Sequence, residues 1–165
     1  MDDAIETAFT RAMAALDPPV LIVTAEAGGE RAGCLVGFAT QSSIRPPRFL
    51  VCISRVNRTY RVAVRAQALI VHLVPQAAAG LAELFGGSSG DEVDKFAAVP
   101  WRRGPRGAPL LTELGSWFAG TVLDRVGLGD HVGFLLEPVA GAVRDGDGPL
   151  LRLRDAHRIA PGHPA

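Results

Sequence analysis

Short apolar segments separated by turn residues dominate the sequence, and they constrain the fold more than any other feature. Segments of this length, joined mostly by turns and interrupted by a few helices, indicate an antiparallel barrel. Closure of such a barrel would remove exposed strand edges. A length of 165 residues suits one domain, since domains commonly hold about 100–200 residues. We therefore expect one α+β domain over residues 1–165, built on a barrel. The strand candidates are Val20–Ala25, Arg31–Phe38, Phe49–Ser54, Ala68–Val74, Trp117–Val126, His131–Val143 and Leu150–Leu153.

Helical patterns stand between some of these strand candidates. Residues 3–16 carry Ile5, Phe9, Met13 and Leu16 at helical spacing, and the double proline that follows ends the pattern. Asn57 is a suitable N-cap for a short helix through residue 65. Further helical segments are expected at 77–85 and 91–98, and residues 100–109 form an arginine- and glycine-rich loop.

Charge and cysteine content exclude several classes of protein. Seventeen basic residues balance seventeen acidic ones, and the pI is near 6.9, which argues against a nucleic-acid binder that works through a basic surface. The acidic start, Met1-Asp2-Asp3, lacks the positive region of a signal peptide, and no apolar run is long enough to span a membrane. Cys34 and Cys52 lack CxxC spacing and are expected to be buried free thiols. We expect a soluble cytoplasmic protein without nucleic-acid or membrane partners.

Several catalytic and metal-binding arrangements are not supported by the sequence. A hydrolase triad would need Asp130 to orient His131, but neighbouring side chains in extended chain point to opposite faces, and no GxSxG motif is present. The glycine-rich residues 86–90 lack the lysine of a phosphate loop. The Asp-Gly-Asp-Gly sequence at 145–148 favours a turn over a calcium loop. No metal site is expected, because the four histidines have no ligand spacing: His72, His131, His157 and His163.

Three segments carry more polar chemistry than folding requires. Residues 37–47 are small and polar before a double proline, so that a flat ligand could approach the backbone; the alternative is an ordinary strand end. Residues 54–59 place hydroxyls and arginines at a helix start, which favours a phosphate; the alternative is a cap with solvated arginines. His131, in Gly129-Asp130-His131, stands at the mouth of a strand, as a ligand contact or as a structural hydrogen-bonding residue.

In this order the segments resemble the flavin reductase-like family, the FMN-binding split barrels that include reductase components of two-component monooxygenases. The resemblance runs from about residue 10 to residue 159, nearly the whole chain. It rests on the hairpin glycines 28–29, Ser43-Ile44-Arg45-Pro46-Pro47, Phe49–Ser54 followed by Asn57-Arg58-Thr59, Leu81–Gly86, Asp94-Lys95-Phe96 and Gly129-Asp130-His131-Val132.

The resemblance implies a split barrel and a flavin-binding oxidoreductase that transfers hydride from NADH or NADPH to FMN. It implies a homodimer with flavin near the subunit interface, and a monooxygenase component as a partner. Departures at Gln41 and at residues 34–37 leave the choice between FMN and FAD open. The implied catalytic residue is His131, and the implied cofactor-binding residues are Phe38, Ala39, Thr40, Gln41, Ser42, Ser54, Arg55, Asn57, Arg58, Thr59, Phe85, Gly86 and Lys95.

Other interpretations of the protein's function remain open at this point. The alternatives are a split-barrel flavoprotein whose tightly bound FMN acts directly on a small substrate, a flavin-binding module without turnover, and a dimeric barrel without a cofactor. Residues 100–109, which could shape a substrate or nicotinamide pocket, are the feature that would separate them.

Overall fold

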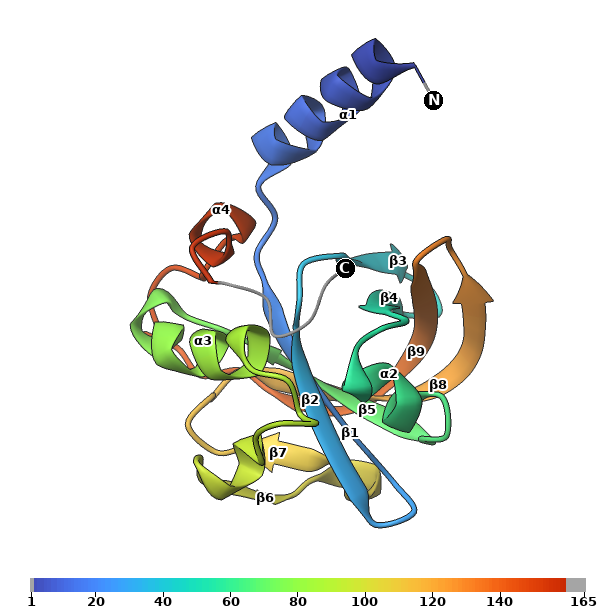
Figure 1. Ribbon diagram of the computed structural model, residues 1–165. Coiled ribbons are helices and arrows are strands. Elements are labelled where there is room, and N and C mark those ends of the chain that lie inside the picture. Colours follow the sequence, from blue (N-terminus) through green and yellow to red (C-terminus); the bar gives the residue numbers. More distant parts are fainter. Residues whose placement is uncertain (1, 160–165) are drawn as a thin grey trace.

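A computed structural model describes residues 2–159, and a curled, seven-stranded antiparallel sheet forms its centre (Figure 1). The sheet does not close, because β2 and β3 remain its edges and no ladder joins them in the described chain. The predicted α+β split-barrel fold is confirmed, whereas the predicted removal of strand edges by closure is wrong. The strands follow in the order β2 (Glu30–Val36), β1 (Leu21–Ala27), β5 (Ala68–Leu73), β8 (Trp117–Gly127), β9 (His131–Ala142), β4 (Arg48–Ser54) and β3 (Ala39–Ser43).

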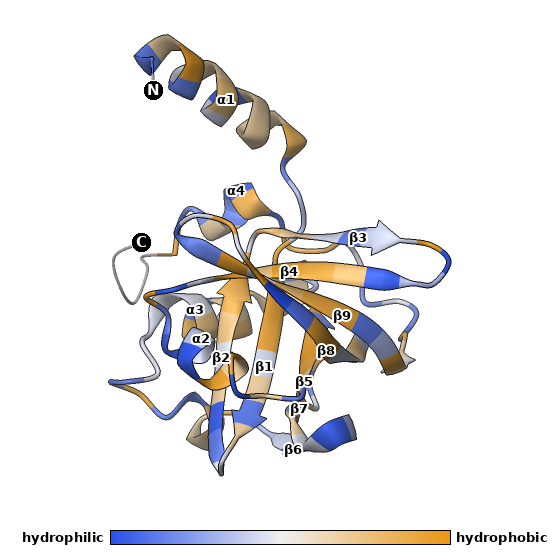
Figure 2. Cartoon of the chain, turned by 90° about the vertical axis from the view of Figure 1, so that its right-hand side faces the viewer, coloured by the Kyte–Doolittle hydropathy of each residue, from blue (hydrophilic) through white to orange (hydrophobic). Residues whose placement is uncertain are grey.

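The middle strands of the sheet are buried on both faces. Every residue from Val20 to Ala25 is buried, and successive side chains of a strand point to opposite faces. Val23 therefore packs in the cluster inside the curl, with Phe134, while Ile22 packs in a second cluster that includes Phe85. Figure 2 shows the resulting apolar strands at the centre of the molecule.

Short helices and one small hairpin surround the sheet. The helices expected at 57–65 and 77–85 are confirmed with shifted ends, whereas the 91–98 segment contains only a 3₁₀ turn. The loop expected at 100–109 contains β6, a 3₁₀ turn and the start of β7. These elements are α2 (Arg58–Ala63), η1 (Gln76–Ala78), α3 (Ala79–Gly87), η2 (Lys95–Ala97), β6 (Trp101–Arg103), η3 (Pro105–Gly107) and β7 (Pro109–Leu111).

Two strand assignments from the sequence differ from the structure. Residues 39–43 form β3, an edge strand whose polar, mostly exposed side chains give no alternating apolar signal. Conversely, residues 150–153 do not form a strand: Leu150 and Arg152 make isolated bridges, and the chain then enters α4 (Leu153–Ala156). The carboxylate of Asp155 accepts the Arg152 N–H at 2.9 Å, a contact that stabilises the helix start.

The N-terminal helix α1 (Asp3–Leu16) stands away from the rest of the molecule (Figure 1). It matches the helix predicted from residues 3–16, but none of its residues is buried. Its apolar side chains Ile5, Phe9 and Leu16 are 59%, 62% and 68% exposed. No helix within residues 2–159 combines the length and the apolar character needed to span a membrane.

His72 joins the main sheet to the β6–β7 hairpin. Its fully buried ring donates from Nδ1 to the Ile22 carbonyl on β1 at 3.0 Å, and Nε2 accepts the Leu111 N–H on β7 at 3.1 Å. Both contacts require the neutral imidazole, since a protonated ring has no acceptor nitrogen. Burial lowers the pKa of His72 from 6.5 to about 4.

We expect this buried histidine to make stability depend on pH. Between pH 6.5 and pH 4 the unfolded chain binds a proton that the folded chain excludes, so stability falls as pH falls through this window. The loss should reach about 3 kcal/mol, at 1.36 kcal/mol for each pKa unit. Urea unfolding at pH 7, 5 and 4 measures it, and His72→Gln should be less stable at pH 7 but lose less on acidification. An equal loss in the variant would contradict the assignment.

Candidate functional site

A cavity of about 310 Å³ lies where the sheet is split, between the ends of β2 and β4. Small-molecule sites commonly begin at about 300 Å³. The backbone N–H of Cys52 donates to the carbonyl of Phe38 at 2.9 Å, which ties the segment after β2 to β4. Helix α3, the loop at residues 88–90 and the C-terminal residues 153–159 supply the other walls. The open seam of the sheet is thus a ligand-sized cavity.

The cavity brings together eight of the fourteen residues named from the sequence. These are Phe38, Ser54, Asn57, Arg58, Phe85, Gly86, Lys95 and His131. Thr59 is buried and borders a neighbouring hollow of about 20 Å³ that also touches Arg58 and Lys95. The remaining five do not line the cavity: Ala39, Thr40, Gln41 and Ser42 lie on the edge strand β3, and Arg55 donates from Nε to the Gly129 carbonyl at 3.0 Å.

Part of the cavity lining is polar and positively charged. Arg58 reaches it from the first turn of α2, and Asn57 caps that helix by accepting the Thr59 N–H at 2.9 Å. Hydroxyl groups in the same cavity lining come from Ser54, Ser88 and Ser89. A guanidinium with several neutral donors is the set of groups that binds a phosphate well.

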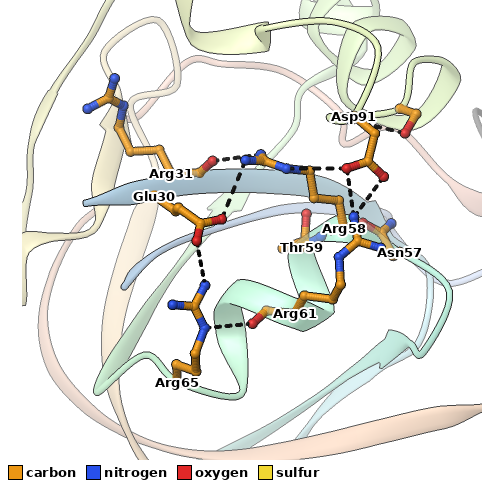
Figure 3. A network of polar contacts seen from close by, with 9 residues as sticks. Glu30, Arg31, Asn57, Arg58, Thr59, Arg61, Arg65 and Asp91 are labelled. Carbon is orange, nitrogen blue, oxygen red and sulfur yellow. Dashed lines mark hydrogen bonds and ion pairs between the residues drawn. The ribbon is translucent and has the colours of Figure 1, made fainter. Parts of the chain in front are cut away.

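Arg58 is held within a network of charged groups (Figure 3). Its Nη1 donates to the Arg31 carbonyl at 3.0 Å, and its other nitrogens lie 3.6 Å from Asp91 and 3.7 Å from Glu30. The side chain is 27% exposed, so it is anchored while still reaching the cavity.

His131 and Phe38 form an aromatic pair in the cavity lining. The β4–β9 register pairs Ser54 with His131, and the Phe38 and His131 rings lie 5.0 Å apart. His131 Nδ1 lies 2.7 Å from Asp130 Oδ1, and this hydrogen bond lowers the pKa of Asp130. The prediction that Asp130 does not orient the imidazole is therefore wrong. Asp130 belongs to the turn before β9, where Gly129 has φ +98°, so strand alternation does not apply.

Lys95 forms part of the inner wall rather than an exposed arm. Its side chain is buried, and Nζ donates to the carbonyls of Gly33 at 3.1 Å and Phe85 at 2.9 Å. Burial lowers its pKa. The ammonium therefore joins the edge strand β2 to α3, and its role as a cofactor contact stays a prediction.

Both cysteines line the cavity as free thiols. Burial raises the pKa of Cys34 to about 11, and burial also raises the pKa of the half-buried Cys52. Because the thiolate is the reactive form, neither thiol is activated. Within residues 2–159 no three His, Cys, Asp or Glu side chains gather to hold a metal; His163 lies outside the described residues.

Two parts of the cavity wall were missed by sequence reasoning. Ser88, Ser89 and Gly90 belong to the glycine-rich residues 86–90, and their combination of glycine with hydroxyl side chains was the signal that could have indicated them. Leu153, Ala156 and Ile159 form an apolar wall from the C-terminal segment. No sequence signal marks that wall, since its residues are ordinary apolar side chains placed there by tertiary packing.

Comparison with known proteins gives a consistent result. The family model described as "Flavin reductase like domain" matches residues 13–160. The chain is 34% identical over 124 residues to the FMN reductase (NADH) RutF of Methylorubrum extorquens, covering 75% of this chain and 60% of that protein. It is 31% identical over 129 residues to the stachydrine N-demethylase reductase subunit Stc3 of Rhizobium meliloti, covering 76% of this chain and 54% of that protein.

Solved structures share the fold. The FMN-binding protein from Thermus thermophilus, solved with bound 1-cyclohex-2-enone, superposes with a TM-score of 0.73 at 26% identity. The match covers 79% of this chain and 72% of that one. The chain spans less than two thirds of the two curated relatives named above, at 60% and 54% of their lengths.

We expect Lys95→Met to destabilise the protein by about 2–4 kcal/mol, because it leaves the buried carbonyls of Gly33 and Phe85 without a donor. Methionine keeps the length and apolar stem of lysine, so the change isolates the ammonium group. Urea unfolding at pH 7 measures the loss. The matched control is Arg102→Met, a substitution on the exposed hairpin strand β6; a Lys95→Met variant no less stable than this control would contradict the structural role.

Proposed function

The chain belongs to the flavin reductase-like family, and we propose that it is an NADH- or NADPH-dependent flavin reductase with FMN as its preferred flavin and FAD as the alternative. The observation that carries the proposal is that one cavity is lined both by an arginine with neighbouring hydroxyl groups and by an aromatic pair. Arg58 with its neighbouring hydroxyls suits a phosphate, and Phe38 with His131 suits a flat ring. The curated relative RutF is named for reduction of FMN by NADH, which supports the same reaction here.

The residues of the cavity fit a flavin mononucleotide by their chemistry. Arg58 would hold the phosphate with donors from Ser54 and Asn57, while Phe38 and Phe85 offer apolar surface to the ring. When bound, the flavin supplies hydride-accepting chemistry that no side chain can supply. The main tasks left to the protein are to orient the ligands and exclude water from them.

His131 is the residue to which we assign the catalytic contact. Its Nδ1 is engaged by Asp130, so the imidazole is held with Nε2 as the nitrogen left for a ligand. Among the described residues no hydrogen bond to Nε2 is made. A fixed imidazole beside the Phe38 ring would orient the nicotinamide and flavin against each other.

We further propose that the protein works as the reductase partner of a monooxygenase component. The similarity to Stc3, which is named as the reductase subunit of a demethylase, supports this role. We also assign the protein to the cytoplasm, a compartment in which two free thiols remain reduced.

The proposed activity is tested by the visible spectrum of the purified protein and by NADH oxidation with added FMN. His131→Ala should lower turnover about 10- to 100-fold, the size of a lost hydrogen bond of about 1.5–3 kcal/mol to a charged group. FMN affinity, measured by fluorescence quenching, should change little. His157→Ala, an exposed histidine outside the cavity lining, is the control. Unchanged turnover in His131→Ala would remove the catalytic role, and tightly bound, non-exchanging flavin without NADH oxidation would favour the prosthetic or binding-module alternatives.

We also propose that the protein is a homodimer and that α1 packs against the second copy. An isolated helix of 14 residues is marginally stable in water, and this one buries none of its apolar face against its own chain. Exposed apolar side chains on the β8–β9 hairpin, including Leu123, Val126 and Leu128, offer surface of matching chemistry.

Phe9→Asp should weaken this dimer by roughly 100-fold or more, because each of two subunits loses a Phe side chain whose burial contributes about 1.5–3 kcal/mol. Sedimentation velocity across a micromolar concentration series measures the change. Thr7→Asp adds the same charge on the opposite face of the helix and is the matched control. A wild-type protein that stays monomeric would contradict the proposal.

A further inference from the structure

Helix α2 and the turn that follows it present three arginines beside the cavity. Arg58 and Arg61 lie three residues apart on the helix, which makes them neighbours on its surface. Arg65 lies two residues beyond the end of the helix and donates from Nε to the Arg61 carbonyl at 3.1 Å. Two carboxylates from outside the helix lie among them: Glu30 at the start of β2 and Asp91 in the loop after α3 (Figure 3). The cluster thus holds three positive and two negative charges.

The two carboxylates lie closer to Arg61 and Arg65 than to Arg58. Both oxygens of Asp91 accept from Arg61 Nη2, at 2.6 and 2.7 Å. Glu30 accepts from Arg65 Nη2 at 3.0 Å. The same carboxylates lie farther from Arg58, at 3.6 and 3.7 Å. The short contacts therefore go to the arginines outside the cavity, and the long ones go to Arg58.

Arg58 is also the one of the three that lines the cavity. Its anchor is neutral, since the short contact of its guanidinium is to the Arg31 carbonyl at 3.0 Å. Gly90 packs over its stem: a Cβ at this glycine would lie 3.1 Å from Arg58 Cδ. Arg58 is thus fixed in place by a neutral carbonyl, and its distances to the two carboxylates stay longer than those of Arg61 and Arg65.

We infer that Arg61 and Arg65 are positioning residues: they engage Asp91 and Glu30 so that Arg58 keeps its positive charge for the phosphate of the flavin. The inference rests on the proposed function for the identity of the ligand. By this inference, the cluster makes the site prefer a phosphorylated flavin over the same ring without phosphate.

The physical reason is competition for one cation. If Arg61 is removed, Asp91 loses the ion pair at 2.6 Å, and the same carboxylate lies 3.6 Å from Arg58. A carboxylate paired with Arg58 neutralises it and repels an incoming phosphate. The interaction of unit charges at about 4 Å in partly solvated surroundings corresponds to an effect of about five- to tenfold on affinity.

The test compares FMN with riboflavin, which has the same ring and no phosphate. Arg61→Gln should weaken FMN binding about five- to tenfold and leave riboflavin binding unchanged. The loss should shrink at 0.5 M salt, because the groups are half-exposed and their charges are screened. Titration by flavin fluorescence gives both affinities on the same protein.

A double variant distinguishes two possible roles of Arg61: keeping the Asp91 carboxylate away from Arg58, and anchoring the loop at residues 88–91. Asp91 also ties residues 88–91 to α2, and its backbone N–H donates to the Ser89 hydroxyl oxygen at 3.2 Å. In Arg61→Gln/Asp91→Asn the carboxylate is removed together with its partner. If Arg61 acts by keeping Asp91 away from Arg58, the FMN affinity of the double variant should return close to that of the wild type. If Arg61 only anchors the loop, the double variant should bind FMN as poorly as the single variant.

The matched control is Arg103→Gln, which breaks an ion pair with Glu26 at 3.4 Å on the β6 hairpin, outside the cavity lining. It should not change the ratio of FMN to riboflavin affinity. A wild-type preference for FMN that persists fully in Arg61→Gln would overturn the inference alone. Equal affinity of the wild type for FMN and riboflavin would instead contradict the proposed contact between Arg58 and the phosphate, and with it the proposed orientation of the flavin.

Discussion

The open edge of the sheet at β2 is the constraint around which the rest of the molecule is arranged. An unpaired strand edge exposes backbone groups that need partners. Here the Lys95 ammonium donates hydrogen bonds to the carbonyl of Gly33 on β2 and to that of Phe85 near the end of α3. The absence of a side chain at Gly33 permits this approach, since a Cβ there would lie 2.7 Å from the Phe85 ring. Helix α3 and the loop that follows are thereby fixed against the split, and the cavity is the space they leave.

Two groups of cavity residues are built by different parts of the chain. The position of His131 depends on the pairing of β4 with β9, which sets His131 opposite Ser54. The position of Arg58 depends on a six-residue helix, and Glu30 and Asp91 from outside that helix pair with the arginines in and just after it. A chain of zero net charge can therefore present one cation to one anion, because its other charges are matched locally.

Much of the secondary structure could be predicted because it depends on local patterns. The helix at residues 3–16 follows from its apolar spacing, and the strands from Val20 onward follow from apolar runs between turns. Strand β3 could not be predicted, because it is held by backbone pairing to β4 and its side chains are polar. The interaction between Asp130 and His131 was predicted wrongly, because the position of a turn by one residue decides whether neighbouring side chains diverge.

The sequence by itself determined the fold class, the order of the elements and the family, because these depend on composition, periodicity and ordered motifs. It also named eight of the residues that line the cavity. Only the tertiary structure decided that the sheet stays open, that Lys95 is buried against two carbonyls, and that Arg61 rather than Arg58 holds Asp91 closely. These features depend on distances of a few ångströms between segments far apart in the chain, and no local pattern encodes such distances.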